Sequence, residues 1–216
     1  MGMVILIAVI AIVALGVQAY LSSIRRKELA TVAARLGLSF SPGTNRDLPG
    51  SYRFLNKLDC GSNRYAQNVI SGVFRGAPVL VFDYHYQVQS GKNTHHYSFS
   101  FFILTLPRAF PELTIVREGV LSKLAQAVGY EDIDFESYEF SRRFCVRSKD
   151  KRFAYDFCNA QMMEYLLAND DLAIEIENDA LALAFGSCLS GAEIERNLNR
   201  LAEVRAGMPS YLFEGA

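Results

Sequence analysis

The sequence lacks the short motifs by which many enzyme classes are recognised. Gly91-Lys92 is the nearest approach to a phosphate-binding loop, but Tyr86 stands where the first glycine belongs and Asn93 where Ser or Thr belongs. No G-x-S-x-G elbow and no H-E-x-x-H helix occurs. We therefore expect no catalytic residue, cofactor or metal site, and the sequence favours a non-enzymatic protein.

Histidine is scarce, with three residues in the chain. His95 and His96 are adjacent, so on a strand they face opposite ways, whereas His85 and one of them could meet across a turn. A structural or surface role of these histidines is one interpretation, and a metal site formed by His85 with His95 or His96 is the alternative.

Neither sign of charge dominates, since 22 Lys and Arg oppose 23 Asp and Glu. No global field attracts nucleic acid, and we expect no nucleic-acid partner. Tryptophan is absent, and the 15 Phe and 11 Tyr are best explained as core residues at strand spacing.

Charge is wholly missing from residues 1–24, which are mostly apolar around the full circumference of a helix. At about 1.5 Å per residue this stretch reaches about 36 Å, enough to cross a hydrocarbon core of about 30 Å. We expect a transmembrane anchor here. Arg25, Arg26 and Lys27 follow at the membrane interface, and they place the N-terminus outside and the C-terminal domain in the cytoplasm of a single-pass inner-membrane protein.

A cleaved signal peptide is the alternative interpretation, because Val17-Gln18-Ala19 fits the small-x-small cleavage pattern. The missing positive segment before the apolar run argues against it. No N-x-S/T sequon and no C-x-x-C pair occurs, so reduced core thiols are expected, with two disulfides in an exported domain as the alternative. The cysteines are Cys60, Cys145, Cys158 and Cys188.

Period-2 and period-3.6 patterns alternate in runs after the anchor, which predicts an α+β fold with a mostly antiparallel sheet and about three packing helices. The expected strands are 68–74, 78–86, 95–106, 113–117, 143–149, 172–177 and 181–185. In the strand 172–177, the face that carries Glu175 is expected to be exposed to solvent. The expected helices are 119–128, one from an Asn159 cap, and one from a capping box at Ser190.

The predicted domain organisation has three parts. Residues 1–24 form the anchor, and residues 25–50 a juxtamembrane amphipathic helix and linker with two prolines and two glycines after Ser41. Residues 51–209 form the α+β domain. Two similar lobes, at about 51–130 and 131–209, are an alternative to one undivided domain.

An acidic run beside a basic run is the most unusual segment. Asp132, Asp134 and Glu136 share one face of an extended chain and could hold a cation through oxygen. Ion pairs within the fold are the plainer interpretation. The third is contact of the basic strand with a partner or anionic headgroups, through Arg142, Arg143, Arg147 and Lys149.

Three blocks in fixed order resemble a family of short, membrane-anchored bacterial proteins with no assigned activity. The blocks are N-x-x-x-G at 68–72, F-D-Y-x-Y at 82–86, and D-I-D-F-x-S at 132–137 followed by E-F-S-R-R. The resemblance covers about residues 50 to 200 and implies a bacterial inner-membrane setting. Tyr138 replaces a proline that is frequent in that family, so the turn geometry before Glu139 is not carried over.

Two functions follow as hypotheses. The first is a membrane-tethered, non-enzymatic domain that binds the bilayer through residues 1–24 and a protein partner, or serves as accessory subunit of a membrane complex. The second is a membrane-proximal lipid or small-ligand binding domain. An enzyme is a third reading, and it would need a pocket that joins Asp83, His85 and the acidic run.

Overall fold

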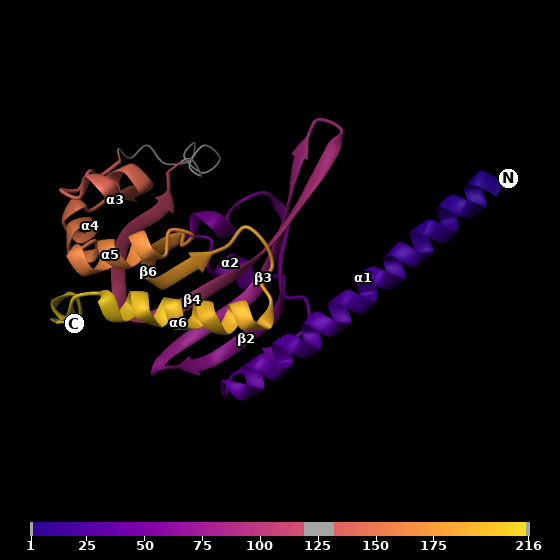
Figure 1. Ribbon diagram of the computed structural model, residues 1–216, viewed down its shortest axis with the longest axis horizontal. Helices are drawn as coiled ribbons and strands as arrows, with labels where there is room; N and C mark the ends of the chain where they lie inside the picture. Colours follow the sequence, from indigo (N-terminus) through magenta and orange to yellow (C-terminus); the bar gives the residue numbers. More distant parts are fainter. Residues whose placement is uncertain (1, 119–131, 215–216) are drawn as a thin grey trace.

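The computed structural model describes residues 2–118 and 132–214, and the predicted helix 119–128 lies outside them. A six-stranded antiparallel sheet carries the fold (Figure 1). Its strands are β1 (Ser39–Ser41), β2 (Ser62–Phe74), β3 (Ala77–Ser90), β4 (Asn93–Arg117), β5 (Phe144–Ser148) and β6 (Ile174–Ala184). The helices are α1 (Gly2–Arg35), α2 (Leu48–Ser51), α3 (Tyr138–Arg143), α4 (Lys151–Phe157), α5 (Ala160–Ala168) and α6 (Gly191–Gly207), with the short 3-10 turns η1 (Asn56–Leu58) and η3 (Ser210–Phe213). The predicted α+β class and antiparallel sheet are confirmed.

Turn chemistry sets the first hairpins. Arg75 and Gly76 both have positive φ, at 48° and 83°, which is the backbone that a two-residue hairpin turn requires between β2 and β3. β3 then pairs with β4 without a break from Val79↔Leu104 to Ser90↔Asn93. The long β3–β4 hairpin projects beyond helices α2 to α6 (Figure 1).

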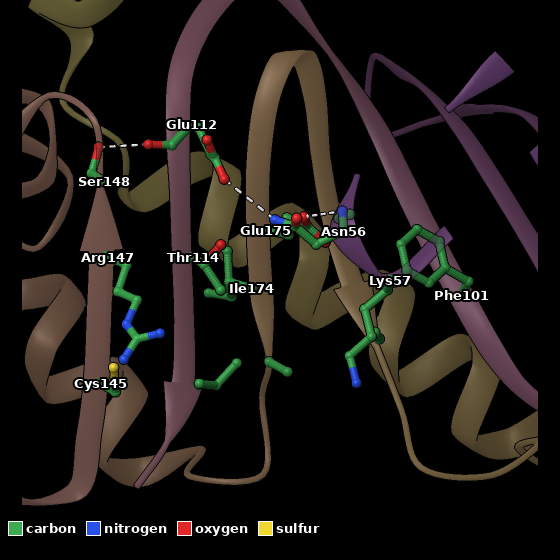
Figure 2. A pocket seen from close by; sticks show the side chains of 14 residues that line it. Asn56, Lys57, Phe101, Glu112, Thr114, Cys145, Arg147, Ser148, Ile174 and Glu175 are labelled. Carbon is green, nitrogen blue, oxygen red and sulfur yellow. Dashed lines mark hydrogen bonds between the residues drawn. The ribbon is translucent and has the colours of Figure 1, made fainter. Parts of the chain in front are cut away.

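β6 folds back on itself between two parts of β4. Residues 180–184 pair with 101–105 of β4, whereas Ile174 to Ile176 pair with Leu113 to Ile115. Asn178, at φ 53°, lies at the bend, and the Ala184 N–H donates to the Ala173 carbonyl across the two arms at 3.3 Å. Figure 2 shows this hairpin between the flanking strands, in agreement with the two predicted strands.

The sheet has a helix-covered face and a second face. Side chains such as Val81, Phe102 and Leu183 form a large core with α1 and α3 to α6. On the other face Phe82, Tyr84 and Phe101 pack under the segment that carries α2 and η1. β5 and β6, from the second predicted lobe, pair with β4 from the first, so one sheet runs through both ranges. The lobe boundary stays a prediction.

The N-terminal helix is continuous from Gly2 to Arg35 and belongs to the domain at its C-terminal end. Leu29 and Ala33 are buried in the main core, and Gly37 with φ 70° ends the helix. The range 25–50, expected as a helix and linker, thus contributes core residues, and β1 and α2 lie within it.

Among the helices of the described residues, none is both long and apolar enough to cross a membrane. The expectation of a transmembrane helix over residues 1–24 is therefore not supported by the structure. The large apolar side chains that are described in that part of α1 are nonetheless exposed, with exposed fractions from 46% at Ile24 to 74% at Met3.

Candidate functional site

An apolar groove lies on the sheet face opposite α1 and α6, between η1 and β5 (Figure 2). Its cavity volume is about 50 Å³. Small side chains line its floor because Ala182 and Ala184 of β6 and Ala173, directly before this strand, lie there. Phe101 and Val116 of β4 complete the apolar surface. Alternation along each strand puts these residues on one face.

Glu175 lies at the groove and is buried, with an exposed fraction of 6%. Its carboxylate accepts a hydrogen bond from the Asn56 N–H at the start of η1, and the Asn56 side-chain amide donates to Glu112 at 3.3 Å. Burial raises the pKa of Glu175 to about 7. The expectation that Glu175 faces water is wrong, since η1 covers it.

Lys57 follows Asn56 in η1 and forms part of the groove wall. Burial lowers its pKa, and Glu175 and Cys60 oppose that effect from nearby. Its ammonium lies 6.0 Å from the centroid of the Phe99 ring. Within residues 2–118 and 132–214 no hydrogen bond or ion pair to this ammonium is present.

Arg147 lines the groove from β5, across from Lys57 (Figure 2). Its guanidinium donates to Asp132 at 2.7 Å, and the Cys145 thiol donates to the same carboxylate at 2.6 Å. Burial and the Asp132 carboxylate raise the pKa of Cys145 to about 12. The thiol therefore stays protonated near neutral pH and is a poor nucleophile.

The predicted basic contact residues are mostly ion-paired within the fold. Arg143 pairs with Glu139 at 2.8 Å, Lys149 with Glu112 at 2.7 Å, and Arg147 with Asp132. Arg142 is exposed and has no ion pair within the described residues. The structure brings Arg147 and Lys149 to the groove region but does not assemble the four residues into one free basic patch.

The three residues predicted at the membrane interface also differ in their surroundings. Arg26 and Lys27 are exposed, but Arg25 points into the protein and pairs with Asp83 of β3, whose side chain is 4% exposed, at 2.8 Å. Arg25 is thus not a free membrane-interface residue. It also donates to the Leu189 carbonyl just before α6.

Asp83 is the centre of a buried polar network. Besides Arg25, it accepts hydrogen bonds from the side chains of Asn68 and Ser100, each at 2.9 Å. The Ser100 hydroxyl in turn accepts the Leu189 N–H at 3.0 Å. The consecutive strands β2, β3 and β4 thus meet α1 and the segment before α6 here, and the network fixes α1 on the sheet.

The candidate enzyme pocket is not formed. Asp83 pairs with Arg25 of α1, and His85, two residues on, shares its strand face. Asp132 instead contacts Cys145 and Arg147, which line the groove on the other face. His85 contacts the Ser98 hydroxyl at 3.0 Å and lies 5.5 Å from His96, ring to ring. In the described part of the chain no three His, Cys, Asp or Glu side chains gather to hold a metal ion. All four cysteines are free thiols.

Comparison with known proteins finds similarity to a solved structure. No family model matches the chain, and no curated protein matches it. A crystal structure of the mycobacterial trehalose monomycolate transport factor A, TtfA, is similar, with a TM-score of 0.65 over 85% of this chain and 96% of that chain. The two sequences are 14% identical, so the likeness establishes a shared fold.

Sequence reasoning missed Lys57, Glu175 and Asp83 as the residues around which these sites form. For Asp83 a signal existed, since an acidic residue in a run of apolar and aromatic strand residues needs a buried partner. For Lys57 no local pattern indicates burial, because only the packing of η1 on the sheet creates it.

Proposed function

We propose that this protein is a membrane-associated, non-enzymatic domain that serves as an accessory subunit or binds a protein partner at the bilayer. The observation that carries the proposal is α1. The large apolar side chains that the structure describes there, such as Met3, Ile12 and Leu21, are exposed over more than half their surface, which water does not favour for several apolar groups on one helix. The other end of the same helix is fixed to the sheet by the Arg25–Asp83 pair.

The likeness to TtfA supports an accessory role. That protein is named as a transport factor for trehalose monomycolate, and its fold is shared over most of both chains. The cytoplasmic placement of the domain belongs to the same proposal and rests on Arg26 and Lys27, which are exposed directly after the apolar stretch.

Vesicle flotation of the full chain tests the membrane part of the proposal. Wild-type protein should float with vesicles of neutral lipid, because the driving force is burial of apolar side chains. Ile10→Glu with Val13→Glu should lower recovery at least about tenfold, since an acidic side chain in the hydrocarbon region costs about 2.5 kcal/mol or more. Val73→Glu, at an exposed apolar residue of β2, is the matched control.

Equal recovery of the wild type and the double variant would remove the membrane proposal. The partner part is tested separately by the size of the complex extracted from native membranes with mild detergent. A monomer in that extract, with no crosslinked product in intact membranes, would contradict an accessory subunit.

The second candidate function is small-ligand or lipid binding at the membrane, and the groove between η1 and β5 favours it. It combines an apolar floor with basic side chains in its walls, which is the usual composition of a ligand site.

A further inference from the structure

Lys57 is the polar group in the groove that the fold itself does not explain. Arg147 has Asp132, Lys149 has Glu112, and Glu175 has the Asn56 N–H as partners. The Lys57 ammonium, by contrast, lies in the groove wall without an ion pair within the described residues and lies over the Phe99 ring. Glu175 lies nearby but forms no ion pair with this ammonium. A partly buried ammonium without an ion pair is unfavourable, and an anionic ligand would supply one.

The surface beside Lys57 is apolar and built from small side chains. Ala182 and Ala184 of β6 and Ala173, directly before this strand, line the groove together with Lys57 and Val116. Figure 2 shows the charged ends of Lys57 and Arg147 on either side of the β6 hairpin, away from Glu112 and Glu175. The groove thus has a basic end and an apolar floor.

We propose that this groove binds a single-chain anionic amphiphile, with its head group on the Lys57 ammonium and its hydrocarbon chain along the alanine floor of β6. The enclosed volume of about 50 Å³ holds a few methylene groups, and the rest of the chain lies in the open part of the groove. Arg147 faces the same end of the groove and retains Asp132 as its partner, so Lys57 is the primary contact. The inference deepens the second candidate function and rests on it, because it names the class of ligand for the same groove. It does not depend on α1 or on a protein partner.

The test is calorimetric titration of the full chain in nonionic detergent, with empty micelles as the blank. Octanoate is the probe, octyl phosphate is the phosphate counterpart, and octanol is the neutral analogue with the same chain. Wild-type protein should bind octanoate or octyl phosphate at least about tenfold more tightly than octanol, because a charge-assisted hydrogen bond is formed only with the anions. The tighter of the two anions identifies the head group as carboxylate or phosphate.

Three variants separate the head-group site from the chain site. Lys57→Gln should weaken binding of the two anions about tenfold and change octanol binding less than about twofold. Lys57→Arg should restore the affinity for the anions. Ala184→Leu fills the floor and should weaken all three probes. Lys92→Gln, at the exposed tip of the β3–β4 hairpin, is the control and should bind like wild type. Far-ultraviolet circular dichroism verifies that each variant is folded.

Anion binding that is equal in wild type and Lys57→Gln overturns the proposal, as does wild-type binding no greater than the empty-micelle blank. A leucine dipeptide with a free carboxylate that binds about tenfold more tightly than octanoate would also overturn it, in favour of a protein C-terminus. If the wild-type chain binds octanoate but does not float with vesicles, the result contradicts the membrane proposal and leaves the groove proposal standing.

Discussion

Asp83 illustrates how one side chain joins distant parts of this chain. The β-bulge between Gln67 and Ile70 places Asn68 at φ 53° and directs its buried amide onto the Asp83 carboxylate. Arg25 supplies the charge that a buried carboxylate needs, and Ser100 supplies a further donor. Asn68 and Asp83 belong to two of the sequence blocks that carry the family resemblance, so these blocks have a structural explanation.

Asp83→Asn should therefore destabilise the fold. The substitution leaves the Arg25 guanidinium, 23% exposed, without its anion, and we expect a loss of about 2–3 kcal/mol in the free energy of unfolding. Urea denaturation in mild detergent measures it. Asp59→Asn, which removes the exposed partner of Arg53 and Arg64, is the control and should cost less than about 1 kcal/mol. Equal losses would show that the buried network has no special role.

Glu175 gives the protein a pH dependence that follows from its burial. Its pKa is about 7 in the folded chain, against an ordinary 4.5. Between these values the folded state keeps the proton and the unfolded state releases it, so stability is highest below pH 4.5 and falls as pH rises to 7. Glu175→Gln removes this loss and should raise the free energy of unfolding at pH 8 by about 2 kcal/mol relative to wild type.

Denaturation of both chains at pH 4.5 and pH 8 checks the Glu175 prediction. The difference between variant and wild type should be near zero at the lower pH, because both side chains are then neutral. Glu164→Gln, at an exposed position of α5, is the matched control. A difference that does not change with pH would contradict the assigned cause.

The packing of α1 on α6 depends on a glycine at the start of α6. A Cβ at Gly191 would lie 2.9 Å from side-chain atoms of Glu28 and Val32 on α1, and the Gly191 N–H donates to the Glu28 carboxylate at 2.7 Å. The capping box of Ser190 and Glu193 fixes the backbone at this point. The first turn of α6 is thus both a helix start and a docking surface.

Gly191→Ala should push α1 away and cost about 1–3 kcal/mol, as overpacking of a close contact does. Thermal unfolding followed by circular dichroism measures the loss. Gly186→Ala provides the matched control, since a Cβ there has no heavy atom within 4 Å. If both variants melt alike, close packing of α1 on α6 is not important for stability.

The whole molecule combines an exposed apolar helix end with a domain to which that helix is rigidly joined. Because Arg25 is held by Asp83 directly after the apolar stretch, no flexible linker separates the two. If α1 enters the bilayer, the domain must lie at its surface.

The proposed cytoplasmic placement predicts the accessibility of the β3–β4 tip. Lys92→Cys in intact cells should not react with a membrane-impermeant maleimide, and it should react after the membranes are opened. The wild-type chain measures background labelling of the native cysteines. Reaction in intact cells would place the domain outside and would reverse the orientation inferred from Arg26 and Lys27.

The blocks that the sequence makes conspicuous are largely structural. Ser137 caps α3 by accepting the Phe140 N–H at 3.3 Å, and Asp132 pairs with Arg147. Tyr84 donates from its hydroxyl to the Leu58 carbonyl at 3.0 Å and so fixes η1. The acidic and basic runs pair with each other, as the plainer interpretation of the sequence held.

The sequence by itself determined the elements whose signals are local. Hydrophobic periodicity, the Asn159 cap and the Ser190 capping box predicted α5 and α6, and alternation of apolar residues predicted strands on both sides of Arg75-Gly76. Caps and periodicity depend on neighbouring residues alone. Only the tertiary structure decided the burial of Lys57 and Glu175 and the pairing of Arg25 with Asp83. Those depend on which face of the sheet η1 and α1 cover, and contacts between residues 58 or more positions apart leave no local pattern.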